Sequence, residues 1–162
     1  RAEPSPFNVL NSVVNDRLRL EVREKLGASY APGSGTQQST VYPGVGLLMI
    51  QAMSDPDKVD SLVAACLGVA QSLAEDGVTD EEIARLREPI LKQRRDAKRN
   101  NGYWMNVLSK AQREPGHLDE ARSGDAFYES FTAAELTPLA RQYLQRERAS
   151  VLVVNPRAIE EK

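Results

Sequence analysis

Two side chains with hydrogen-bonding chemistry flank the end of a predicted helix. Arg23 falls one turn before the end of an amphipathic helix predicted over residues 7–26, and Tyr30 follows the helix-ending Gly27. A guanidinium offers a planar fork of donors to a carboxylate or to backbone carbonyls. A phenol offers one further donor. The spacing therefore predicts a helix-to-strand corner at which both groups could converge on one ligand.

Each of these two residues also has an ordinary structural explanation. Arg23 could be an exposed helix arginine paired with Glu21 or Glu24. Tyr30 could be a core aromatic residue whose hydroxyl lies at the rim of the core. The residue types alone leave both explanations open.

The rest of the chain offers little catalytic chemistry. It contains one histidine, His117, and one cysteine, Cys66, so it holds neither a His-x-x-Glu-His metal motif nor a Cys-x-x-Cys pair. No phosphate-binding glycine loop or nucleophile-elbow motif is present. We interpret His117 as a solvent-exposed side chain on a loop and Cys66 as a buried thiol. The segment alone is predicted to be inactive, with no catalytic residue, metal site or cofactor of its own.

The sequence around Arg23 resembles a family of proteases. Residues 22–30 read VREKLGASY, which is similar to the LREK-x-G-x-x-Y signature of the pitrilysin, insulysin and mitochondrial-processing-peptidase zinc metallopeptidases, the inverzincins. In that family the signature lies in the C-terminal homologous half, which does not bind metal. The expected order of helices, hairpin and last strand agrees with that half over most of the chain. Of the G-x-x-S-R-L segment that commonly precedes the signature, only Arg17 and Leu18 remain.

The resemblance implies a fold and a function. The fold would be an α/β (α+β) two-layer sandwich of the LuxS/MPP-like metallohydrolase type. Its mostly antiparallel or mixed sheet would carry helices on one face and lack the strand expected before Arg1. The chain would be the substrate-binding, non-catalytic half of a zinc metalloendopeptidase.

The same resemblance implies partners and residue roles. Zinc would lie in a homologous His-x-x-Glu-His-bearing domain, on the same chain or on a separate subunit. Arg23 would bind backbone carbonyls or a carboxylate of a peptide substrate, and Tyr30 would donate to the scissile carbonyl. The alternative function is an inactive peptidase-like domain that serves as a dimerisation or scaffold module.

The remaining pattern predicts one domain over residues 7–156, between a linker at 1–6 and a tail at 157–162. Residues 31–41 are polar and glycine-rich, as in an edge strand, and 45–53 are apolar, as in a central strand buried on both faces. The edge strand is either a plain solvent-facing edge or a place where an extended peptide adds a strand. Helices are expected after Asp55, after the Thr79 capping box and over 132–145. A loop with one helical turn is expected over 118–131, and a buried strand at 151–154. A short helix anchored on the core by Trp104, Val107 and Leu108 completes the list.

The charge balance excludes some broad classes. With 21 basic and 23 acidic residues, the chain has no global signal for nucleic acid or a membrane surface. The basic stretch at 92–101 is best explained as a solvated helix face, with nucleic-acid binding as the weaker alternative. No apolar run reaches the roughly 20 residues that cross a bilayer. The compartment stays open, and bacterial periplasm and cytoplasm are both compatible with the sequence.

Overall fold

The structure is a computed structural model that describes residues 5–26, 32–39, 41–42, 45–114 and 116–155, without the side chains of 23–26. In chain order its elements are α1 (Pro6–Leu18), η1 (Arg19–Leu26), β1 (Gly33–Gln38), β2 (Gly46–Gln51), η2 (Pro56–Lys58), α2 (Val59–Asp76), α3 (Asp80–Lys98), α4 (Asn101–Ala111), α5 (His117–Ser130), α6 (Ala133–Tyr143) and η3 (Arg146–Arg148). No helix in these ranges is both long enough and apolar enough to cross a membrane.

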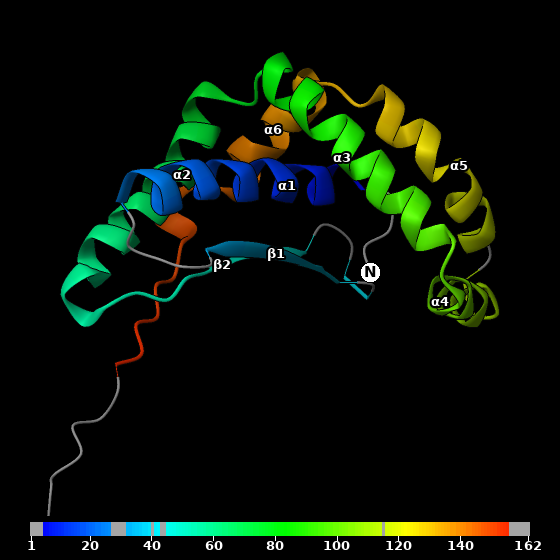
Figure 1. The fold of residues 1–162 in the computed structure, drawn as a ribbon, viewed down its shortest axis with the longest axis horizontal. Coiled ribbons are helices and arrows are strands. Elements are labelled where there is room, and N and C mark those ends of the chain that lie inside the picture. Colours follow the sequence, from blue (N-terminus) through cyan, green and yellow to red (C-terminus); the bar gives the residue numbers. More distant parts are fainter. Residues whose placement is uncertain (1–4, 27–31, 40, 43–44, 115, 156–162) are drawn as a thin grey trace, which may run out of the picture.

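Helix α1 is the centre of the fold. It lies between the β1–β2 hairpin and the helices α2, α3 and α6 (Figure 1). Ser5 caps it by accepting a hydrogen bond of 3.3 Å from the backbone N–H of Phe7. Its apolar face repeats at helical spacing and is fully excluded from solvent. The residues of this face are Val9, Leu10, Val13, Val14 and Leu18.

The hairpin is attached to α1 through a polar stripe of asparagines. The Ser34 backbone N–H donates to Asn15 Oδ1 at 2.7 Å, and the hydroxyl of Thr36 donates to Asn8 Oδ1 at the same distance. On the apolar strand, Leu48 and Ile50 pack against the core from the same side. One face of the hairpin is therefore fixed on α1, as the predicted helices-on-one-face arrangement requires.

Two capping boxes begin the helices as predicted. Thr79 begins α3, and Thr132 begins α6, each in a reciprocal exchange with the glutamate three residues later. Gly77 ends α2 in a positive-φ conformation, at φ 82°. The predicted helix over 7–26 is also confirmed as one helical run, although its hydrogen bonding changes at Arg19 from α to π.

The strand predictions are confirmed in part. The antiparallel hairpin forms, but β2 is not buried on both faces, because α1 covers only one of them. Leu47 and Met49 are 55% and 46% exposed on the other face. The buried strand predicted at 151–154 is wrong. These residues are exposed, lie in no helix or strand, and do not pair with β1 or β2.

Three predictions in the second half of the chain need correction. Residues 117–130 form helix α5 and not a loop with one helical turn. Small residues, Ala121 and Gly124, make up much of its buried face, so the sequence shows no strong apolar stripe there. His117 is its first residue and is buried, not exposed. In α4 only Val107 is buried, whereas Trp104 and Leu108 are 40% and 53% exposed.

The fold class is thus only partly as expected. The described residues are mostly helical, with one two-stranded antiparallel sheet. The larger two-layer sandwich remains an expectation.

Candidate peptide-binding site

The predicted site residues fall at the edge of what the structure describes. The backbone of Arg23 lies in η1, while its side chain and the whole of Tyr30 lie outside the described residues. The pairing of these two groups therefore stays a prediction. What the structure provides is the geometry of the helix that leads to them.

The helix that carries Arg23 is π-helical. Segment η1 continues α1 without a break and widens the helix from Arg19 onward. Val22, within this segment, is fully buried and ties it to the core. Stretches of π-helix are rare in proteins and often occur at functional sites. This local geometry was not predicted from the sequence.

Arg17 holds the end of α1 against the corner between α2 and α3. Its guanidinium donates to Glu82 from Nε at 2.6 Å and from Nη2 at 3.0 Å. It also donates to the Ser72 hydroxyl at 3.0 Å and to the Gly77 carbonyl at 2.9 Å. Such bidentate, charge-assisted bonds fix both position and orientation. The start of η1, two residues later, is therefore anchored to the helical layer.

Glu82 links this anchor to the capping box of α3. Burial by itself raises the pKa of the Glu82 carboxyl, but hydrogen bonds from Arg17 and the Thr79 backbone outweigh it and hold that pKa below its usual range. The contacts that anchor α1 and begin α3 thus favour the charged form of this carboxylate. In the sequence, Arg17 stands out only as part of the family signature. Its partner Glu82 lies 65 residues away and was not predicted.

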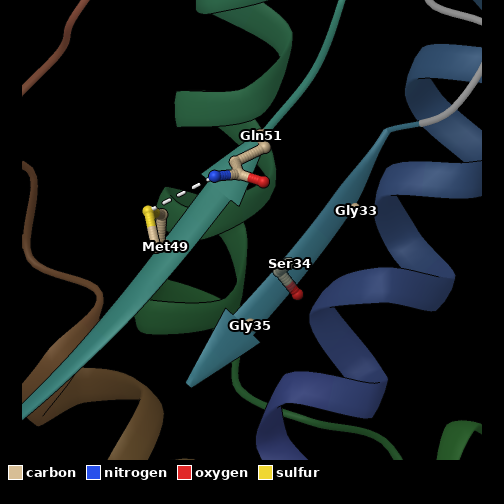
Figure 2. Close-up of a pocket in the computed structure, with 5 residues that line it drawn as sticks. All are labelled: Gly33, Ser34, Gly35, Met49 and Gln51. Carbon is tan, nitrogen blue, oxygen red and sulfur yellow. Dashed lines mark hydrogen bonds between the residues drawn. The ribbon is translucent and has the colours of Figure 1, made fainter. Parts of the chain in front are cut away.

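The face of the hairpin turned away from α1 contains a shallow hollow. Its volume is about 260 Å³, and it is lined by Gly33, Ser34, Gly35, Met49 and Gln51. Figure 2 shows the glycine-rich strand on one side and Met49 and Gln51 on the other, joined by a 3.7 Å contact from the Gln51 amide to the Met49 sulfur. A Cβ built on Gly35 would meet nothing within 4 Å, so the backbone there is open.

The described residues do not fit a zinc site. No group of three His, Cys, Asp or Glu side chains among them could hold a metal ion. His117 lies 3.5 Å from the Glu120 carboxylate, an (i, i+3) neighbour on the same helix. Cys66 is half-buried, and this burial raises the pKa of its thiol, which disfavours the thiolate that metals bind. No step of a reaction is assigned to a metal on these residues.

The chain belongs to the peptidase M16 family: the profile of the peptidase M16 inactive domain matches residues 3–90. The predicted family is therefore confirmed.

Curated relatives agree with this assignment. The chain is 26% identical to the chloroplastic stromal processing peptidase of Oryza sativa subsp. indica over 148 residues, which cover 90% of this chain and 12% of that protein. It is 29% identical to an uncharacterized zinc protease of Streptomyces coelicolor over 154 residues, which cover 93% of this chain and 33% of that protein. The chain thus spans a third or less of these relatives.

Solved structures share the fold. The periplasmic protease PqqL of Escherichia coli matches 86% of this chain with a TM-score of 0.68 at 14% identity, over 15% of its own length. A conserved protein from Enterococcus faecalis matches 85% of this chain with a TM-score of 0.70 at 18% identity, over 32% of its own length.

Proposed function

We propose that this chain is the substrate-binding, non-catalytic half of a zinc metalloendopeptidase. The observation that carries the proposal is the match of the inactive-domain profile to residues 3–90, a range that includes both Arg23 and Tyr30. The zinc and its His-x-x-Glu-His motif belong to a complementary domain, on the same chain or on a partner subunit. A relative named as a zinc protease supports a zinc enzyme as the complete assembly.

In this proposal the two predicted residues act on the peptide. Arg23 binds backbone carbonyls or a carboxylate of the substrate with its fork of donors. Tyr30 donates a hydrogen bond to the scissile carbonyl as negative charge develops on its oxygen. The bonds from Arg17 to Glu82, Ser72 and Gly77 support this by fixing the helix from which Arg23 projects.

Peptide turnover by the chain together with its zinc-bearing half tests these roles. We expect Tyr30→Phe to lower kcat about 10²–10³-fold, the usual effect of losing one oxyanion donor. Arg23→Ala should mainly raise KM, because it removes a contact to the bound peptide. Matched controls are Arg95→Ala, which removes an exposed arginine of α3, and Tyr103→Phe, which removes a hydroxyl on α4. If both site variants stay within twofold of the controls, the assigned roles are wrong.

The scaffold alternative is favoured by one observation. Residues 151–154 read VLVV, and Leu152 and Val154 are 87% and 82% exposed. Apolar side chains so exposed typically mark a surface that an assembly covers. The larger LuxS/MPP-like two-layer sandwich is also part of this proposal. Unchanged turnover in the Arg23 and Tyr30 variants, with loss of subunit association on Leu152→Glu, would favour the scaffold function.

A further inference from the structure

The hairpin lies in a segment without any charged residue. Residues 28–54 contain no Asp, Glu, Lys or Arg, although these types make up 27% of the chain. Charged groups are depleted from surfaces that a partner covers, because burying an unpaired charge is costly. A surface exposed only to water can carry charged groups without this cost. The composition of this segment therefore points to a surface that is covered by an uncharged partner.

The structure shows which face of the hairpin this is. The register pairs Gly35 with Met49 and Gln37 with Leu47, and these side chains alternate with those that contact α1. Along the outward face Leu47 and Met49 are about half exposed, and the flanking Val45 is 59% exposed. The result is an apolar stripe along β2 beside a glycine-rich floor on β1. We call this surface the outward face.

The hollow described above lies within the outward face. Its floor is the backbone around Gly33 and Gly35, and Met49 and Gln51 form its wall (Figure 2). At about 260 Å³ it is smaller than the roughly 300–1,000 Å³ typical of sites for whole small molecules. A space of this size suits an individual side chain of a larger ligand. Its glycine floor also leaves the strand backbone accessible to an extended chain.

We propose that the outward face binds an extended, uncharged segment of a peptide, with one apolar side chain seated in the hollow over Gly33 and Gly35. The proposal rests on the proposed function and adds to it the class of substrate: the peptide is neutral and apolar at this position. Charge complementarity selects this occupant, since a charged side chain here would lose its hydration and find no opposite charge on residues 28–54.

A binding experiment on the full chain tests the proposal. The probe is a fluorescein-labelled octapeptide of Thr and Gln with Leu at two alternate positions, and its twin carries Glu in place of each Leu. We expect fluorescence anisotropy to show binding of the Leu peptide and at least tenfold weaker binding of the Glu twin. Equal binding of the two peptides would overturn the proposal.

Two variants locate the binding to the hollow. Gly35→Glu adds a side chain and a charge at the hollow, and its Cβ meets no atom within 4 Å. Gly68→Glu on α2 is the matched control, since its Cβ is equally unobstructed and the charge change is the same. We expect at least a tenfold loss of affinity for the first and less than twofold for the second. Met49→Gln changes the wall of the hollow and should weaken peptide binding several-fold. The melting temperature of this variant should equal that of the wild type.

The other outcomes assign the face to a different occupant or separate the two proposals. If the chain forms a dimer that excludes the peptide and Gly35→Glu dissociates it, the occupant is a second copy and the peptide proposal falls. If deletion of residues 151–155 is needed before the peptide binds, the occupant is the chain's own tail. Loss of binding in Gly35→Glu, with unchanged turnover in both Arg23→Ala and Tyr30→Phe, supports the outward face and contradicts the roles assigned under the proposed function. The reverse pattern contradicts only the outward face.

Discussion

Replacing Arg17 by methionine should destabilise the domain far more than replacing any exposed arginine. The methionine keeps an apolar stem of similar length but removes the donors to Glu82, Ser72 and Gly77. The Glu82 side chain is only 11% exposed, so its carboxylate would remain buried without its counter-charge. The loss is therefore an uncompensated buried charge and not merely a missing contact.

The size of the effect follows from the burial of the pair. Removing one partner of a buried ion pair typically costs about 3–5 kcal/mol. Arg17 itself is 18% exposed, and Thr79 continues to donate to Glu82, so we expect the lower end, about 3 kcal/mol. Arg95→Met is the control, because Arg95 and its partner Glu88 are 55% and 72% exposed, and their ion pair should contribute about 0.5 kcal/mol.

Urea unfolding followed by circular dichroism at pH 7 measures both values. A double mutant of Arg17→Met and Glu82→Gln should lose clearly less stability than the sum of the single variants, because the second change removes the stranded charge. If Arg17→Met lost no more free energy of unfolding than Arg95→Met, or if the double mutant were additive, the anchoring role of Arg17 would be refuted.

Further predictions concern pH, backbone and thiol chemistry. Burial raises the pKa of the Glu82 carboxyl, but hydrogen bonds from Arg17 and Thr79 outweigh burial and hold that pKa below its value in the unfolded chain. The charged carboxylate therefore stabilises the fold at pH values above the unfolded pKa, and this stability is lost as pH falls through the folded pKa. Wild type should therefore lose more unfolding free energy than Glu82→Gln on acidification; parallel losses would contradict this. Gly77→Ala, at φ 82° and with an α6 hydroxyl 2.7 Å from its Cβ, should cost about 2–3 kcal/mol in thermal unfolding, whereas Gly68→Ala should be neutral or stabilising by up to about 1 kcal/mol. Because burial raises the pKa of the Cys66 thiol, iodoacetamide should alkylate it more slowly in the native protein than in urea, and equal rates would contradict that.

Local sequence signals predicted local structure well. The capping boxes at Thr79 and Thr132 and the amphipathic pattern of the helix over 7–26 each depend on residues within a few positions of one another. Such interactions can be recognised without knowledge of the fold. Helix α5 was missed because Ala121 and Gly124 give no strong apolar stripe, although they are buried against neighbouring helices.

Long-range features were not predictable in the same way. Arg17 meets Glu82 only because α1 crosses the corner between α2 and α3, and no local pattern encodes that crossing. The predicted burial of the two strands was wrong for a related reason. The apolar residues of β2 and of 151–154 can be recognised in the sequence, but the sequence does not show whether another part of the protein covers them. The charge-free segment 28–54 was visible in the sequence, yet its meaning depended on the register that places its exposed side chains on one face.

The most direct test of the account is reconstitution of peptide cleavage. The isolated His-x-x-Glu-His-bearing half is assayed for cleavage of a quenched fluorescent peptide, with and without this chain, and zinc is quantified on each component. We predict that adding the chain raises kcat/KM at least tenfold, and that zinc is stoichiometric on the catalytic half and absent from the chain. Unchanged turnover on addition of the chain, or stoichiometric zinc on the chain itself, would contradict its assignment as the non-catalytic half of the peptidase.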